Sequence, residues 1–310
     1  MFFWFLILVS FSQPAGNPRL VMAEHLSRQG LYLYALNQVD SIIDKGLEDE
    51  DTYAFRGGIL SQLGMYESAI TDFETARGSS RLEFRDGEWY SYARFSLGDC
   101  SAAEELRSLR YFGSFHLAGW IRLMFTEIEM HRYCNHPQKA HDVQVEMMNI
   151  FPRAVKSHLA QADLALDEGD VDLAWRALFS SQIDFQYIGA IDVLARIALI
   201  EERYEDAFRQ MQYIKAQRVS DRSMILKGLA TLLAGDPSVL LFRLNQSRWI
   251  MNENPHIVFL RLWALKETGE NAEYSDTLSW LESYCDSDCI SWVQRNLERE
   301  IQAPLPFKIL

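Results

Sequence analysis

Apolar residues recur along most of the chain at the spacing of amphipathic helices that are joined in pairs. Between Tyr53 and Ala76 they return every three or four positions on both sides of Gly64, as expected for two helices that each bury one face. Glycine tolerates the left-handed backbone conformation with which many helices end. The pattern therefore predicts a first helix that ends at Leu63, a turn at Gly64, and a second helix from Tyr66 to Ala76.

This hairpin repeats at an almost constant interval. One position early in each second helix is small in six of eight copies, and successive copies are separated by 34, 34, 37, 34, 33, 33 and 34 residues. These positions are Ala35, Ala69, Ala103, Ala140, Ala174, Ala207, Leu240 and Tyr274. Five residues before each of them stands a turn position, occupied by Gly30, Gly64, Gly98, Asn135, Gly169, Glu202, Gly235 and Gly269. A reversing chain needs a turn residue that tolerates positive φ and a small residue where the helices cross, so we expect eight stacked hairpins, with Glu202 as the exception among the turns.

The interval places the hairpins in one continuous array over residues 17–302. The expected units lie near residues 18–46, 50–80, 84–112, 116–152, 154–186, 188–218, 221–252 and 255–284. The one longer interval, of 37 residues, is assigned to three extra residues in the turn at 131–138. Apolar residues on one side of segment 290–302 predict a helix that caps the last unit, and an apolar tail follows at 303–310.

The repeat resembles the tetratricopeptide repeat (TPR) in its interval and in a run of six residues. These residues are Leu63, Gly64, Tyr66, Ala69, Phe73 and Ala76. The resemblance implies an all-α fold, namely a right-handed superhelical solenoid of about eight TPR-like helical hairpins plus a C-terminal capping helix. It also implies a concave face, lined by the first helix of each unit, that holds a protein or peptide partner.

Matching the inward-facing places of the family selects twelve residues as candidates for partner binding. They are Arg85, Glu88, Tyr92, Arg122, Glu129, Lys156, Asp163, Asp167, Asp192, Arg196, Arg222 and Trp263. Aromatic side chains mixed with both signs of charge favour an extended peptide or a partner helix over a polyanion. Because few residues dominate an interface, we expect most of the twelve to be ordinary surface.

The first eleven residues are almost uninterruptedly apolar, and they are about half as many as a helix needs to span a bilayer. Small residues follow at Ser10, Ser12, Ala15 and Gly16, where a signal peptidase could cut. We therefore predict a signal peptide over residues 1–16, an exported protein in a bacterial periplasm, and no stable transmembrane span. A basic residue before the apolar run is missing, and a buried first helix is the alternative.

The net charge bears on the class of ligand, and the cysteines bear on possible disulfides. A net charge of −13 and a pI near 5.0 argue against nucleic-acid binding, which needs clustered basic residues. Of the four cysteines, Cys285 and Cys289 are the favoured disulfide, which would close a five-residue loop and fasten the capping helix. Two free thiols are the alternative. Cys100 and Cys134 lie in the turns of successive units and are the less favoured pair.

Residue types that bind metals gather between His131 and His141. The set is His131, Cys134, His136 and His141, with His116 nearby. Their spacing matches no common zinc pattern, so we expect a surface loop and no metal. The sequence also lacks the phosphate-binding, nucleophile and metalloprotease motifs of common enzyme classes. We therefore expect neither catalytic residues nor a cofactor.

These observations favour a non-catalytic, exported scaffold or adaptor that mediates protein–protein interaction. The setting we expect is bacterial envelope assembly, secretion or polysaccharide export. The alternative is a regulatory or substrate-presenting subunit of a membrane-associated glycan synthase or another envelope enzyme. Direct catalysis or carbohydrate binding in the groove is a third, less favoured hypothesis, because motifs for it are absent.

Overall fold

The computed structural model describes residues 18–77, 84–112, 117–180, 187–214, 221–245 and 252–284, and five further positions at 290, 291, 293, 294 and 297. In these residues the chain forms sixteen α-helices and no strand. The all-α repeat fold expected from the sequence is therefore confirmed. Within the same ranges, no helix combines the length and apolar content needed to cross a bilayer.

The helices follow one another in eight consecutive pairs, which we call units 1 to 8. Their bounds are α1 Val21–Arg28, α2 Tyr32–Ile43, α3 Glu50–Leu63, α4 Tyr66–Arg77, α5 Phe84–Ser96, α6 Ala102–Phe112, α7 Leu117–Tyr133, α8 Pro137–Ile150, α9 Val155–Asp167, α10 Val171–Ser180, α11 Ile188–Ile200, α12 Tyr204–Gln212, α13 Asp221–Leu233, α14 Pro237–Leu244, α15 Pro255–Thr268 and α16 Asn271–Tyr284.

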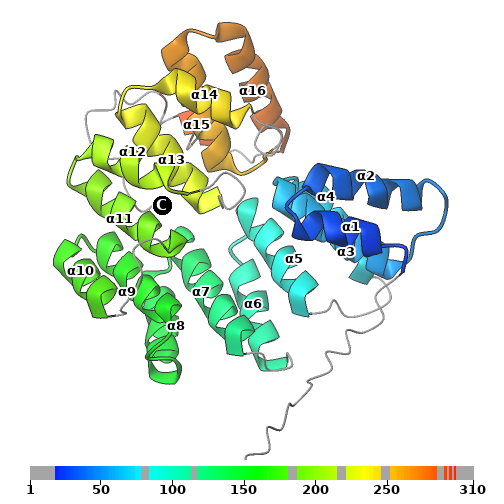
Figure 1. Cartoon of the computed structure of the whole chain (residues 1–310), viewed down its shortest axis with the longest axis horizontal. Helices are drawn as coiled ribbons and strands as arrows, with labels where there is room; N and C mark the ends of the chain where they lie inside the picture. Colours follow the sequence, from blue (N-terminus) through cyan, green and yellow to red (C-terminus); the bar gives the residue numbers. More distant parts are fainter. Residues whose placement is uncertain are drawn as a thin grey trace, which may run out of the picture.

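Each first helix packs against its own partner, and from α3 onward each also packs against the first helix of a neighbouring unit. The contacts between first helices include α3 with α5, α7 with α9, α9 with α11, α11 with α13, and α13 with α15. The first helices therefore form an inner layer and the second helices an outer one. Figure 1 shows the units following one another round an arc.

All eight turn positions have the positive φ that the repeat predicts, between 54° at Asn135 and 96° at Gly98. Glu202, the one unfavourable residue, also has a φ of 59°. At Gly64 the backbone N–H of the following residue, Met65, donates to the carbonyl of Leu60 at 3.0 Å, which closes the end of α3. The six alanines at the crossing positions are completely buried, so the helices of each pair approach closely.

The longer interval in unit 4 has a different origin from the one expected. Its turn has the same length as the others, since Asn135 and Ala140 keep the usual separation of five residues. The extra residues lie in α7, which has 17 residues, whereas α5, α9 and α11 each have 13. The assignment of an insertion to residues 131–138 was therefore wrong, because a longer helix with unbroken apolar spacing looks the same as a longer turn.

Beyond unit 8, the described positions of the capping segment are helical and partly buried. Val293 is fully buried and Leu297 is 7% exposed, and both join the core formed by α13 and α15. Lys266 donates a hydrogen bond from Nζ to the carbonyl of Leu297 at 2.7 Å, which ties this segment to α15. The predicted signal peptide at 1–16, the pair Cys285 and Cys289, and the tail at 303–310 lie outside the described residues.

The array closes on itself, which the sequence analysis did not foresee. Residues just before α15 lie against the turn between α3 and α4, more than 180 residues earlier in the chain. The N–H of Glu253 donates to the carbonyl of Gly64 at 2.9 Å, and the N–H of Glu67 donates to the Glu253 carboxylate at 2.9 Å. In Figure 1 the units accordingly run round until unit 8 approaches unit 2, so the molecule is a closed ring.

Candidate partner-binding groove

The inner layer contains a cavity of about 430 Å³ that is lined by α3, α5, α7, α9 and α11. We call it the groove chamber. Seven of the twelve candidates line it, namely Glu88, Tyr92, Arg122, Glu129, Lys156, Asp163 and Asp192. The family-based placement thus brings these residues to one site, because the same face of successive first helices points into the ring. That they bind a partner stays a prediction.

An ion pair between two successive units lines this chamber. Arg122 of α7 binds Glu88 of α5 in a two-pronged arrangement, with Nε 2.7 Å from Oε1 and Nη2 2.6 Å from Oε2. The Arg122 side chain is still 46% exposed. A guanidinium in this geometry is held in place while part of its surface faces the cavity, so it can orient a polar group of a ligand.

Lys156 of α9 places a second cation beside aromatic side chains. Its Nζ lies 4.9 Å from the centroid of the Phe125 ring, a distance typical of a cation–π contact. Burial lowers the pKa of Lys156, and the nearby Glu129 and Glu88 carboxylates oppose that shift while Arg122 adds to it. The ammonium is therefore partly dehydrated, and a polar or anionic group of a ligand would replace the missing water.

Aromatic rings complete this wall of the groove chamber. Trp89 and Tyr92, both from α5, meet edge to face with their centroids 6.0 Å apart. Tyr92 also meets Tyr66 of unit 2 at 6.1 Å. Such contacts hold rings rigidly, and rigid aromatic surface next to fixed charges is the composition found at the centres of protein interfaces.

Three of the candidates, Asp163, Asp167 and Arg196, hold the chamber wall together from inside. Arg196 of α11 binds Asp163 at 2.6 Å and Asp167 at 2.7 Å, and Arg132 of α7 donates to Asp167 at 2.8 Å. The Arg196 side chain is completely buried and that of Asp163 is 1% exposed. This cluster joins units 4, 5 and 6. Its first role is structural, because its charges already have partners in the protein.

Other candidates also lie in the protein interior or outside the described side chains. Asp192 is 5% exposed and accepts a hydrogen bond from Ser223 Oγ at 3.0 Å, which joins α11 to α13. Trp263 is 5% exposed and packs on Phe259 in the core of the last units. The side chains of Arg85 and Arg222 lie outside the part of the chain that can be described.

A second cavity of about 290 Å³, which we call the inner chamber, adjoins the first. The two chambers share Tyr92, Thr126 and Glu129. One wall of the inner chamber comes from α5 and α7, and the opposite wall includes Ile225 of α13 and His256 at the start of α15. The sequence analysis did not find this chamber, because its two walls meet only when the ring is closed.

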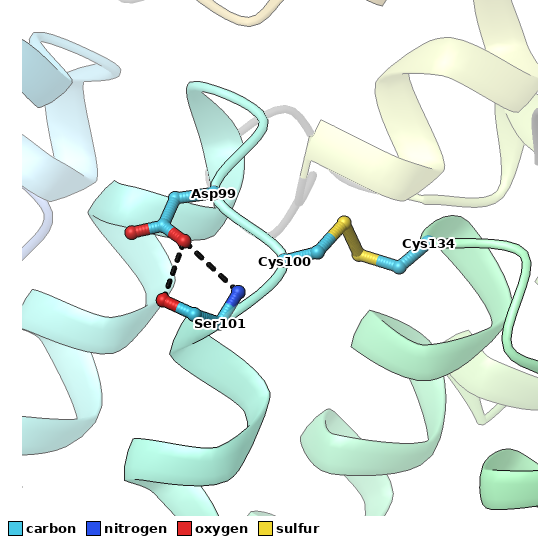
Figure 2. The surroundings of a disulfide bond; sticks show 4 residues. All are labelled: Asp99, Cys100, Ser101 and Cys134. Atoms are coloured by element: carbon cyan, nitrogen blue, oxygen red, sulfur yellow. Dashed lines mark hydrogen bonds between the residues drawn. A yellow bond between two sulfur atoms is a disulfide. The ribbon is translucent and has the colours of Figure 1, made fainter.

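The inner chamber borders a disulfide between Cys100 and Cys134, shown in Figure 2. The two cysteines stand in the turns of units 3 and 4, 34 residues apart in the chain, with their Cα atoms separated by 5.8 Å. This is the pair that the sequence analysis favoured less. In the same turn, the Asp99 carboxylate accepts hydrogen bonds from the N–H and the hydroxyl of Ser101, at 2.9 and 2.6 Å.

Two residues of the candidate metal-binding set have other surroundings in the structure. Cys134 is bonded to sulfur and is not a ligand, and His131 is 1% exposed inside the protein. Where the structure describes the chain, no group of three or more histidine, cysteine or acidic side chains could hold a metal ion.

Close to this turn, a buried carboxylate has an altered pKa. Glu127 of α7 has no exposed side-chain surface and lies 3.0 Å from the guanidinium of Arg110 on α6. Burial raises the pKa of Glu127 to about 7, and Arg110 and Arg107 counter part of the shift. Burial lowers the pKa of the adjacent His131 to about 4. The two groups belong to the packing between α6 and α7 and line neither chamber.

Comparison with known proteins assigns neither a family nor a function to the chain. No protein-family model matches the chain, and no curated protein matches it in sequence. Similar solved structures include a tetratricopeptide repeat protein from Parabacteroides merdae, at 10% identity and a TM-score of 0.38, over 90% of this chain and 96% of that one. Yeast Tom70 has 10% identity and a TM-score of 0.47, over 86% of this chain and 58% of that one. The TPR domain of P58(IPK) has 11% identity and a TM-score of 0.27, over 92% and 99% of the two chains. All three TM-scores are below 0.5, so no property of these proteins is carried over to this chain.

Proposed function

We propose that the protein is a non-catalytic scaffold that holds a segment of another protein in the groove chamber. The observation that carries this proposal is the composition of the chamber wall. It combines the exposed Glu88–Arg122 pair, the partly dehydrated Lys156 and the rings of Trp89 and Tyr92. Both signs of charge beside rigid aromatic surface fit a polypeptide, which offers backbone, apolar and charged groups along one strand or helix.

The same wall argues against other classes of ligand. A polyanion would meet Glu88 and Glu129 beside the two cations, and the chain as a whole carries a net charge of −13. A volume of about 430 Å³ accommodates several side chains of a bound segment, and it lies in the range of pockets that enclose small ligands. The volume therefore does not distinguish a polypeptide segment from a small ligand. The lining residues recur on successive units, and this arrangement favours the elongated ligand.

We further propose that the protein is exported, as part of the bacterial envelope, and acts there in assembly, secretion or polysaccharide export. The apolar segment at residues 1–11 supports this proposal from the sequence. The Cys100–Cys134 disulfide supports it from the structure, because disulfides persist in oxidising compartments and are rare in the cytosol of mesophiles.

The proposal is tested by affinity purification with two matched double variants. The groove variant is Arg122→Ala with Lys156→Ala. The control is Lys139→Ala with Arg203→Ala, which also removes two positive charges, but from side chains that are 51% and 47% exposed and pair only with surface carboxylates. All proteins are first shown to melt at similar temperatures.

We expect the wild type and the control to recover the same partner from an envelope extract, and the groove variant to recover it at least tenfold less. Equal recovery by both variants would refute the groove as the binding site. Failure of the wild type to enrich any protein over an unrelated bait would refute the scaffold function itself.

A further inference from the structure

The contact that closes the ring is small and well defined. It includes the N–H of Glu253 on the Gly64 carbonyl and the N–H of Glu67 on the Glu253 carboxylate, each at 2.9 Å. Glu67 lies in the first turn of α4, where the helix itself offers no acceptor for its N–H group. The Glu253 carboxylate therefore acts as a cap for α4 that is supplied from the other end of the chain.

The fit between the two segments is close enough to exclude a single methyl group. Asn252 is only 2% exposed and lies directly on Gly64. A Cβ atom placed on Gly64 would stand 2.6 Å from Cγ and 3.1 Å from Cα of Asn252. Gly269 has nearly the same backbone conformation, with a φ of 77° against 78°, but a Cβ atom there would meet nothing within 4 Å.

Closure also builds the inner chamber. Residues 252–256, which we call the strap, lead from this contact into α15 and place His256 against Tyr133 of α7, with ring centroids 5.1 Å apart. Pro255 and His256 then form the chamber wall opposite α5 and α7. Without closure that wall would move away, and the inner chamber would open to solvent along one side.

The contacts that hold the ring shut differ in kind from the packing inside each unit. Adjacent helices bury continuous apolar clusters, whereas no residue of the strap belongs to such a cluster; the strap is held by hydrogen bonds, by the buried Asn252 amide and by the ring contact of His256 with Tyr133. Repeat arrays change curvature through small rotations between neighbours, so a weak contact between distant units can open while the units stay folded.

We propose that the strap is a reversible closure, which shuts the ring round a polypeptide segment bound in the two chambers and opens to admit or release it. The proposal rests on the scaffold function argued above. Because the chambers share Tyr92, Thr126 and Glu129, a segment that fills both touches the inner layer and the strap together. Such a segment binds the closed ring more tightly than the open one, and by linkage it favours closure to the same extent.

Hydrogen exchange of the protein alone tests the closure. In the wild type we expect the N–H groups of Glu67 and Glu253 to exchange at least tenfold more slowly than unprotected amides. They should also exchange at least tenfold faster than amides in the middle of α3 and α9. Exchange at the unprotected rate would show that the ring is open, and exchange as slow as in the helix interiors would show that it never opens separately. Either result overturns the proposal.

Gly64→Ala and Gly269→Ala form the matched pair of variants, because both place alanine at a left-handed turn residue and only the first meets the strap. We expect the Glu67 and Glu253 amides to exchange at least tenfold faster in Gly64→Ala and unchanged in Gly269→Ala. Equal behaviour of the two variants would refute the steric argument. If Gly64→Ala fails to fold, Glu253→Ala leaves the turn intact and is expected to accelerate exchange of the amides at positions 67 and 253 by a similar factor, and acceleration at position 67 alone would refute the closure.

The two proposals can fail separately. These measurements need no partner, so their failure removes the strap and leaves the affinity purification unaffected. For a partner recovered by the wild type, Gly64→Ala is expected to increase the dissociation rate at least fivefold relative to Gly269→Ala. An unchanged rate would show that the strap does not enclose the bound segment, even where the groove variant abolishes binding.

Discussion

Replacing Arg196 by methionine separates a structural role of this arginine from a role in partner binding. The guanidinium is completely buried in the wall of the groove chamber, where it binds Asp163 at 2.6 Å and Asp167 at 2.7 Å. Methionine fills a similar volume without charge, so the change removes the ionic contacts and leaves most of the packing. The 1% exposed Asp163 carboxylate then loses its nearest cation.

The structure sets the expected size of the effect. Removal of one member of a buried ion pair typically costs about 3–5 kcal/mol, because a charge remains buried without compensation. Here Arg132 lies 3.7 Å from Asp163 and also holds Asp167, so some compensation remains. We therefore expect a loss at the lower end, about 3 kcal/mol in the free energy of unfolding. Arg203→Met, which breaks only exposed pairs, should cost at most about 1 kcal/mol.

The assay is denaturant unfolding of the wild type, of the three single variants Arg196→Met, Asp163→Leu and Arg203→Met, and of the double variant Arg196→Met with Asp163→Leu. The double variant removes the stranded charge, so it should recover at least half of the loss. Asp163→Leu alone leaves Arg196 paired with Asp167 and should cost less than Arg196→Met. If Arg196→Met costs no more than Arg203→Met, the buried-charge argument is refuted. A stable Arg196→Met protein that no longer binds the partner would instead show that Arg196 contributes to partner binding.

Two further predictions concern the region around units 3 and 4. Replacing both Cys100 and Cys134 by serine should lower the free energy of unfolding by up to about 4 kcal/mol, which is the chain-entropy value for a separation of 34 residues. Wild-type unfolding curves that are the same with and without reductant would contradict this prediction. Burial raises the pKa of Glu127 from 4.5 to about 7, so between these pH values the folded protein holds a proton that the unfolded chain releases. The contribution of this group to stability is therefore fully present below pH 4.5 and is lost as the pH rises to about 7. Glu127→Gln should remove about 3 kcal/mol of that decline, and melting curves of both proteins between pH 4.5 and 8 would show it as a flatter profile.

The helices and turns could be predicted from the sequence because their causes are local. A helix with one buried face shows its period directly, and a reversal needs a residue that accepts positive φ. The repeat was strong enough to locate a turn at Glu202, whose φ of 59° its own residue type does not favour. The origin of the longer interval at unit 4 was missed, because a longer α7 keeps the same apolar spacing.

The roles of the charged residues on the inner face could be predicted less well. Their direction towards the ring interior followed from the repeat, and seven of the twelve candidates do line the groove chamber. The burial of these charged side chains could not be predicted from the repeat, since the sequence looks the same whether a charge faces solvent or a partner in the next unit. Arg196 shows the difference, because its partners Asp163 and Asp167 stand 33 and 29 residues earlier, about one repeat away.

That separation is a signal that the sequence does contain. The Arg122–Glu88 pair spans 34 residues, the Arg132–Asp167 pair spans 35, and the Cys100–Cys134 disulfide spans 34. Residues one repeat apart occupy equivalent places on neighbouring units, so complementary residue types at this offset indicate a bond between units. Applied to this chain, the rule would have raised Cys100–Cys134 above the pair at Cys285.

The same rule explains why the closure of the ring could not be predicted and why it differs in kind from the other bonds. The bonds at one-repeat offsets are concentrated in units 3 to 6, where they fix the curvature of the groove wall. The strap contact has no such offset, because it depends on the sum of small rotations over six units. On the closure proposed above, a wall stiffened by ion pairs and a disulfide keeps its geometry while the hydrogen-bonded contact at Glu253 opens. Opening would then admit a segment without moving the residues that contact it.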